Sequence, residues 1–200
     1  MKITAMAMMA LMAGTAAFAQ FTVSAAGRNV SICLEDETGS LVAGQARMLA
    51  SKMFREIGVA IVWHGHFRNC STGAILISLR QNTPANLKPG VLAYAAPYEG
   101  THIRVFYDRI CQMHEPAMVP TVLAHVLVHE ITHILQGVSR HSEAGIMKAY
   151  WGEKDCFQMR FKPLQFAQED IDLIYQGLAA RSRRAMLAAS TGMPETQTAR

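Results

Sequence analysis

The chain has few charged residues and no strong excess of either sign. Charged residues make up 17% of its 200 positions, and the formal net charge is +4. The sequence lacks the dense basic stripe with interleaved aromatic residues that nucleic-acid-binding surfaces usually carry, so a nucleic-acid partner is not expected. Half of the residues are hydrophobic, which is enough for a globular core. Length and composition together predict one domain with short tails.

Long hydrophobic runs are also scarce, and the main candidate lies at the amino terminus. Residues 1–19 combine a positive charge at Lys2 with an apolar stretch, and Ala17-Phe18-Ala19 fits the small-x-small pattern that precedes signal cleavage. The apolar stretch is short for a membrane anchor. We therefore expect residues 1–19 to be a signal peptide. The protein would be exported, as a periplasmic or secreted protein, with no stable membrane insertion after cleavage.

Cysteine is scarce as well, and the spacing of the cysteines excludes a zinc knuckle. The four cysteines are Cys33, Cys70, Cys111 and Cys156. In an exported protein they could form two disulfides, with three possible pairings. One hypothesis pairs Cys111 with Cys156, because these two flank the histidine-rich segment described below.

Hydrophobic patterning predicts strands and helices in a mixed order. Five apolar or alternating stretches are predicted as strands, at residues 29–35, 59–63, 74–79, 91–95 and 102–107. Three longer stretches with a helical stripe are predicted as helices, at residues 41–57, 118–135 and 164–178. This order indicates an α/β or α+β fold with one sheet. Residues 20–184 would form the folded domain and residues 185–200 a mobile tail.

A histidine-rich segment lies at the end of the second predicted helix. His129 and His133 are four residues apart, so both imidazoles lie on one face of that helix. Such a pair can supply two zinc ligands, and Glu130 beside them can act as a base. The chain from His133 to His141 is long enough to fold back toward the metal, so His141 is the expected third ligand. Three protein ligands would leave a fourth position open to water, as in catalytic zinc sites.

Other residues compete for a role at this site. An acidic third ligand in place of His141 remains an alternative, with the candidates Glu143, Glu153 and Asp155. His125 extends the ligand face by one more turn and is expected in the core or behind the ligands. The pair His64 and His66 could bind a surface metal, although a solvated or capping role is expected for it.

This segment resembles the metzincin clan of zinc peptidases, which carry HExxHxxGxxH followed by a methionine turn. The matching residues are His129, Glu130, His133, Gly137, His141 and Met147. The passage from His141 to Met147 is similar to that of matrix metalloproteinases, and the whole chain is closer still to small exported bacterial metzincin-like proteins. One extra residue on each side of Gly137 makes the loop before His141 two residues longer than the clan pattern.

The resemblance implies a metzincin or zincin-like fold. Such a fold has a single twisted, mostly parallel sheet of about five strands with an antiparallel edge strand. The sheet would pack on a backing helix and an active-site helix, and a C-terminal helix would follow. The edge strand would bind a peptide substrate through its main chain, and the matching residues are Leu92, Ala93, Tyr94 and Ala95.

The resemblance also implies a zinc-dependent endopeptidase with one catalytic Zn²⁺. His129, His133 and His141 would hold the metal, and Met147 would form the floor of the site. Glu130 would assist the attack of zinc-bound water on the peptide bond and pass the proton to the leaving amine. The expected partner is a peptide or protein substrate, and the protein is expected to be a monomer.

Two other function classes remain open at the level of the sequence. The first is an exported zinc-binding interaction domain with little or no peptidase activity. The second is a zinc-free interaction domain stapled by disulfides. Metal analysis separates the second class from the others, and a peptide-cleavage assay separates the first from a peptidase.

Overall fold

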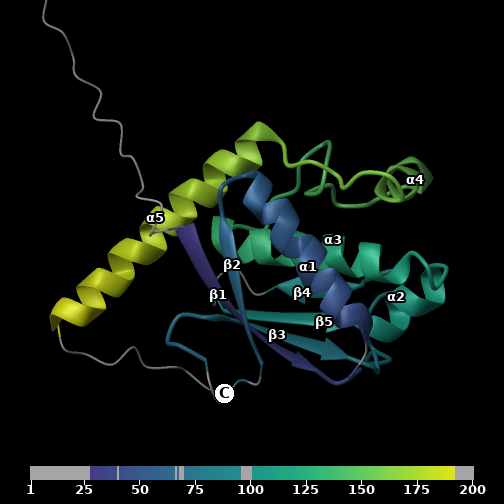
Figure 1. Cartoon of the computed structure of the whole chain (residues 1–200), viewed down its shortest axis with the longest axis horizontal. Coiled ribbons are helices and arrows are strands. Elements are labelled where there is room, and N and C mark those ends of the chain that lie inside the picture. Colours follow the sequence, from purple (N-terminus) through teal and green to yellow (C-terminus); the bar gives the residue numbers. More distant parts are fainter. Residues whose placement is uncertain (1–27, 40, 66, 68–69, 96–100, 192–200) are drawn as a thin grey trace, which may run out of the picture.

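The computed structural model describes residues 28–39, 41–65, 67, 70–95 and 101–191. The predicted signal peptide and residues 192–200 lie outside these ranges. The elements are β1 (Asn29–Asp36), α1 (Leu41–Glu56), β2 (Ala60–Gly65), β3 (Ile75–Arg80), β4 (Ala93–Ala95), β5 (His102–Phe106), α2 (Tyr107–Met113), α3 (Val119–Gln136), α4 (Glu153–Met159) and α5 (Gln168–Thr191) (Figure 1).

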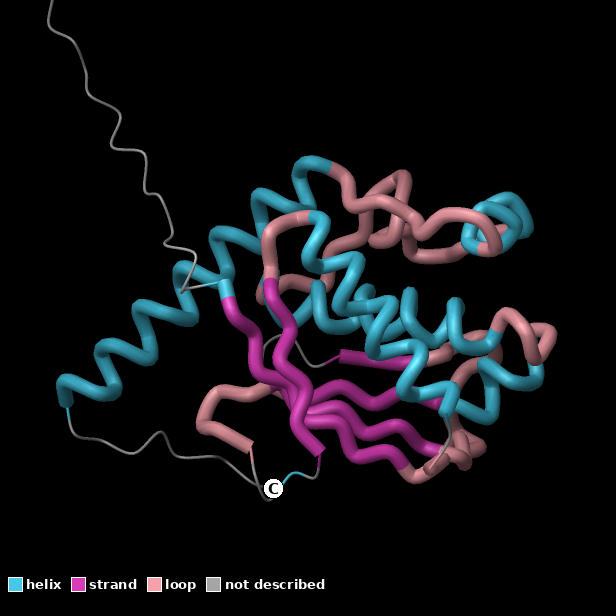
Figure 2. The backbone as a smooth tube through the Cα atoms, viewed as in Figure 1, coloured by secondary structure: helices cyan, strands magenta, loops and turns pink. Residues whose placement is uncertain are grey.

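The five strands form one mixed sheet with the order β2-β1-β3-β5-β4. Strands β2, β1, β3 and β5 are parallel to their neighbours, and β4 pairs antiparallel with β5 at one edge. The predicted fold class, a single mostly parallel sheet with an antiparallel edge strand, is confirmed. Figure 2 shows α1 and α3 together on one side of this sheet.

The core lies between the sheet and the helix pair α1 and α3. Ile32 of β1 and Ile75 of β3 are fully buried, as are Phe54 of α1 and Leu123 of α3. Helix α3 is buried along almost its whole length, from Val122 to Gln136. A helix that is apolar nearly all round belongs in a protein interior, which explains its central place between α1, β4, β5 and α5.

Helix α3 ends where the sequence predicts. Gly137 has φ +70°, in the left-handed region, and its N–H donates to the carbonyl of His133. Glycine adopts this conformation without the steric cost that a Cβ adds. The chain therefore leaves the helix axis directly after the second histidine and can turn back toward it.

The helices differ from the prediction in the bounds of the last one and in their number. Helix α5 begins at Gln168, four residues after the predicted start, and it continues to Thr191. The predicted tail at residues 185–200 is therefore helical as far as the structure describes it, and the alanine, methionine and leucine at residues 185–189 are strong helix formers. The seven-residue helices α2 and α4 were not predicted, since each is too short to show a helical period.

The disulfide hypothesis is also wrong. Cys33 is bonded to Cys70, whereas Cys111 and Cys156 carry free thiols. Cys33 lies in the middle of β1, which pairs with β3, and Cys70 lies on the chain that enters β3. Sheet pairing therefore brings the two Cα atoms to 6.1 Å, within the range that a disulfide requires.

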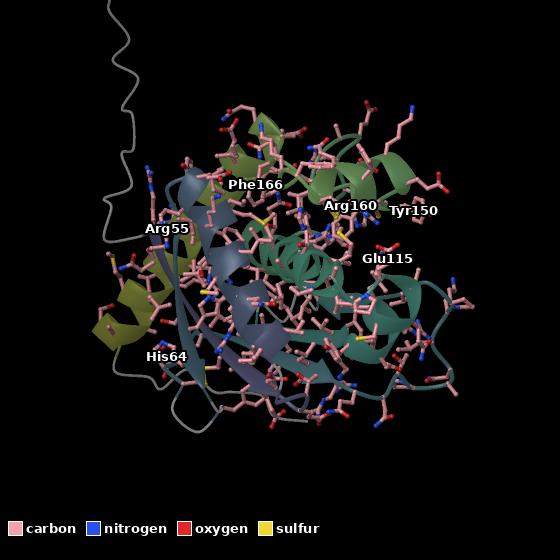
Figure 3. The ribbon with its side chains drawn as sticks, turned by 45° about the vertical axis from the view of Figure 1, so that its right-hand side comes forward. Arg55, His64, Glu115, Tyr150, Arg160 and Phe166 are labelled. Carbon is pink, nitrogen blue, oxygen red and sulfur yellow. A yellow bond between two sulfur atoms is a disulfide. The ribbon has the colours of Figure 1, made fainter. Side chains whose placement is uncertain are left out.

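The segment that contains α4 is tied to the start of α3. Arg160, just after α4, donates to the Glu115 carboxylate at 3.0 Å, and Figure 3 shows the two side chains on the same side of the molecule.

Among the described residues, no helix combines the length and the apolar character that crossing a bilayer requires.

Candidate metal centre

The two histidines of α3 are each oriented by a backbone carbonyl. Nδ1 of His129 lies 2.9 Å from the carbonyl oxygen of Ile146, and Nδ1 of His133 lies 3.2 Å from that of Val138. A carbonyl only accepts hydrogen bonds, so each Nδ1 carries the proton and each Nε2 presents a lone pair. This arrangement of a fixed tautomer with a free Nε2 is typical of metal-binding histidines.

The two Nε2 atoms face one another at 3.1 Å. Burial is the main cause that lowers the pKa of His129 to about 4, although the bond to Ile146 acts in the opposite direction. Burial also lowers the pKa of His133. Both rings are therefore neutral near pH 7. The two Nε2 lone pairs then face each other with no proton to form a hydrogen bond between them. Two nitrogens on a tetrahedral zinc ion lie about 3.3 Å apart, so the pair fits such a cation.

His141 joins the two buried histidines from the loop after α3. Its ring lies 5.3 Å from that of His129 at an interplanar angle of 28°, and 5.0 Å from that of His133 at 89°. One ring nitrogen from each of the three histidines lies within 4.8 Å of the others. His141 is exposed, whereas His129 and His133 are buried. The predicted triad is thus brought together, with one side open to solvent.

The acidic alternatives to His141 lie elsewhere. Among the described residues, the three histidines form the one cluster with metal-ligand spacing. Asp155 accepts from Lys148 and from the N–H of Gly152. Glu143 and Glu153 are exposed.

The second histidine pair is not brought to this site. His64 is half-buried on β2, at the sheet edge opposite β4, and His66 lies outside the described residues.

Glu130 connects the ligand helix to the edge strand. Burial is the main cause that raises its pKa to about 8, and a hydrogen bond from the backbone of Ala95 acts in the opposite direction. A cation beside this carboxyl would lower its pKa, because opposite charge favours the ionised form. The Glu130 carboxyl is thus a buried, titratable group held between α3 and β4.

Strand β4 presents backbone groups on the side away from β5. The Leu92 carbonyl accepts from the Phe106 N–H at 2.8 Å, so Leu92 faces β5. Since hydrogen-bonding direction alternates along a strand, Ala93 and Ala95 direct their N–H and carbonyl groups outward. Tyr94 packs against Phe106, with ring centroids 6.2 Å apart. Strand β4 is the last strand on its side of the sheet, so the described residues leave this edge unpaired.

The segment around Met147 lies against the ligand cluster. Met147 is fully buried, and its carbonyl accepts from the N–H of Ser142 at 2.8 Å. Gly145 has φ +75°, and a Cβ there would lie 2.2 Å from the carbonyl oxygen of Gln165. The turn therefore requires glycine at this position. It places the neighbouring Ile146 carbonyl where the first histidine ligand needs its acceptor.

Trp151 supports the same carbonyl. Its indole N–H donates to the Ile146 oxygen at 3.2 Å, and its ring meets that of His129 edge-on, with centroids 5.6 Å apart. The structure gives it a contact with the first histidine of the triad.

His125 lies one turn before the ligands and has both ring nitrogens occupied. Its Nδ1 lies 2.7 Å from the Thr121 carbonyl, and its Nε2 accepts from the Leu164 N–H at 3.1 Å. The ring is therefore neutral and anchors the segment that leads to α5. Burial lowers its pKa below the ordinary value of 6.5.

This lowered pKa predicts that the contribution of His125 to the stability of the metal-free protein falls once the pH drops below about 6.5. His125 takes up a proton more readily in the unfolded chain, so its contribution is complete above the unfolded pKa. That contribution declines as the pH falls toward the folded pKa, by at most about 1.4 kcal/mol per pH unit. His114, His129 and His133 have lowered pKa values too, and the raised pKa of Glu130 changes the stability in the opposite direction. The contribution of His125 is therefore the difference between wild type and His125→Gln.

Urea unfolding of both proteins between pH 7.5 and 5.5 measures this difference. The His125→Gln protein should be less stable at the higher pH and should show the shallower decline. Equal slopes in the two proteins would contradict the assignment of His125 as a buried neutral histidine.

Sequence reasoning missed one buried residue near the site. Asp170, in the first turn of α5, is fully buried and contacts the loop around His141. An aspartate in a first helical turn is ordinary, so the sequence alone offers no signal that separates it from a surface residue.

The fold is similar to that of a solved structure, archaemetzincin from Methanopyrus kandleri. The TM-score is 0.57 with 13% sequence identity, over 76% of this chain and 97% of the archaemetzincin chain. No protein-family model matches the sequence, and no curated protein matches it. At this identity the likeness concerns the fold alone. The chain has the zincin-like fold that the sequence resemblance implied.

Proposed function

We propose that the protein is a zinc-dependent endopeptidase. The observation that carries the proposal is the pair of neutral, carbonyl-oriented imidazoles whose Nε2 atoms face one another at 3.1 Å, with His141 converging on them. The donor set fits zinc, which prefers neutral histidine nitrogens in tetrahedral sites. The fold that the chain shares with an archaemetzincin and the HExxH spacing support the same conclusion.

The residues of the site divide the chemistry of hydrolysis between them. His129, His133 and His141 would hold zinc, which would supply Lewis acidity toward water and the scissile carbonyl. The Glu130 carboxylate accepts the proton of the attacking water and delivers it to the leaving amine. Its burial keeps bulk water from competing for that proton and lets small changes in its surroundings tune its pKa. Trp151 packs its ring against His129 and shares the Ile146 carbonyl with it, and the buried Met147 follows Ile146 directly in the chain.

Strand β4 is the proposed binding site for the substrate backbone. An extended peptide can pair with the outward N–H and carbonyl of Ala93, as in other complexes where a peptide adds to a sheet edge. The Ala95 amide is engaged by Glu130, so a peptide paired at Ala93 lies next to the carboxyl. Backbone pairing of this kind is independent of side chains and supports an endopeptidase acting on extended segments.

We also propose that the protein acts outside the cytoplasm. The leader at residues 1–19 has the charge, apolar stretch and small-residue motif of a signal peptide. The Cys33–Cys70 disulfide supports this location, because disulfides persist in oxidising compartments.

Metal analysis with a cleavage assay tests the function. Purified wild-type protein should contain about one zinc ion per chain and cleave quenched peptides. A chelator should stop cleavage, and zinc should restore it. The His141→Ala variant should bind zinc at least about 100-fold more weakly, since a lost ligand should cost more than the 10–100-fold typical of a lost ligand partner. His64→Ala is the matched control and should bind zinc like the wild type.

Two outcomes would reject the proposal in different ways. Wild-type protein without stoichiometric zinc would reject the metal centre. Stoichiometric zinc with no cleavage across a broad peptide library would leave an exported zinc-binding domain without peptidase activity.

A further inference from the structure

The buried carboxylate of Asp170 binds two residues of the loop that carries His141. Asp170, in the first turn of α5, has no solvent exposure. It accepts from the Ser142 hydroxyl at 2.7 and 2.8 Å and from Nη1 of Arg140 at 3.0 Å. Nε2 of Gln136 lies 3.4 Å from the same carboxylate. A buried carboxylate needs such partners because it has lost its hydration.

The two main partners of Asp170 stand on either side of His141. Arg140 precedes it and Ser142 follows it, and one carboxylate holds both. Since the two contacts enclose a single residue, they restrict the backbone position from which the His141 ring extends. This loop is two residues longer than the metzincin pattern, so it needs an anchor outside its own length.

His141 itself lacks the anchor that the other two histidines have. His129 and His133 each donate Nδ1–H to a carbonyl, whereas the ring of His141 makes no hydrogen bond to the described residues. It is also the exposed member of the triad. Metal-binding histidines normally depend on such a partner for their orientation. For His141 the restraint has to come from the backbone on its two sides.

We propose that Asp170 is a positioning residue of the metal centre: it holds His141 in ligand geometry by fixing Arg140 and Ser142 on either side of it. This inference rests on the proposed zinc site. Asp170 does not touch the metal or the substrate, and its effect on zinc passes through His141.

Zinc affinity of the Asp170→Asn protein tests the proposal. Asparagine keeps the size of the side chain but removes the charge and one acceptor oxygen. Competition with chelators of graded strength should show zinc binding weakened about 10–100-fold. The visible spectrum of the Co²⁺-loaded protein should change as well, because it reports ligand geometry. Glu169→Gln is the matched control, since Glu169 also pairs with Arg140 but is largely exposed and has no bond to Ser142. It should bind zinc like the wild type.

A double substitution separates positioning from a general loss of structure. If Asp170 acts through His141, Asp170→Asn should weaken zinc binding no further in a His141→Ala background. A purely structural defect would instead add to the His141→Ala effect. Full additivity of the two effects, or wild-type affinity in Asp170→Asn, would overturn the proposal.

The Ser142→Ala variant decides the matter if Asp170→Asn does not fold. It removes the 2.7 and 2.8 Å bonds and leaves the carboxylate paired with Arg140. Zinc binding should weaken several-fold, up to about 10-fold. Unchanged affinity in this variant would overturn the proposal. These results are distinct from a failure of the proposed function, in which the wild type itself binds no zinc or binds it without cleaving peptides.

Discussion

Replacement of Glu130 by glutamine is expected to remove nearly all peptide cleavage while zinc stays bound. Glutamine has the shape of glutamate and can still accept the Ala95 N–H, so the link between α3 and β4 should survive. An amide cannot take up the proton of the attacking water, however. Loss of a general base typically costs about 10²–10⁴-fold in rate. The zinc content should not fall, because Glu130 is not among the clustered metal ligands.

The measurement is kcat/KM on a quenched peptide, together with the zinc content of each preparation. Glu143→Gln is the control, since it makes the same chemical change at an exposed carboxylate two residues after His141. It should retain wild-type activity. Cleavage by the Glu130→Gln protein within about tenfold of the wild type, with zinc bound, would remove Glu130 from the role of base.

Replacement of Gly177 by alanine is expected to destabilise the fold strongly. Gly177 lies in α5 where that helix crosses the end of α3, and a Cβ there would lie 1.7 Å from the carbonyl oxygen of Leu135. That atom is backbone of a buried helix, so it cannot move aside as a side-chain end could. The two helices would have to separate, and such overpacking costs about 1–3 kcal/mol or more. The better helix propensity of alanine offsets only about 1 kcal/mol.

Gly44→Ala is the matched control for this prediction. Gly44 also lies within a helix, α1, but a Cβ there would meet no heavy atom within 4 Å. Alanine should therefore stabilise the protein at this position by up to about 1 kcal/mol. Urea unfolding of both variants should give effects of opposite sign. A Gly177→Ala protein as stable as the wild type would show that α5 does not pack on α3 as closely as described.

The parts of the site that could be predicted from the sequence depend on local geometry. A spacing of four residues places His129 and His133 on one helical face whatever the tertiary fold. Gly137 marks the helix end because few other residues adopt its φ. The single-sheet architecture was also predictable, because strands with strong alternation or apolar runs stand out from their flanking turns.

The rest of the site depends on contacts between distant segments, which one sequence does not encode visibly. The partner of Cys33 follows from the pairing of β1 with β3, and four cysteines alone leave three pairings. Asp170 lies 29 residues after His141, and nothing in its own neighbourhood in the sequence distinguishes it. The carbonyl of Ile146 is a backbone group, so its role could not be read from residue type at all.

The unequal exposure of the three histidines has a consequence for how quickly a metal ion is exchanged. The two imidazoles on α3 are rigid and shielded, and the third stands at the surface on a loop. A bound ion would therefore enter and leave most easily on the side that His141 covers, without unwinding of the central helix. Its lifetime would then depend on how firmly Asp170 holds Arg140 and Ser142 on either side of His141.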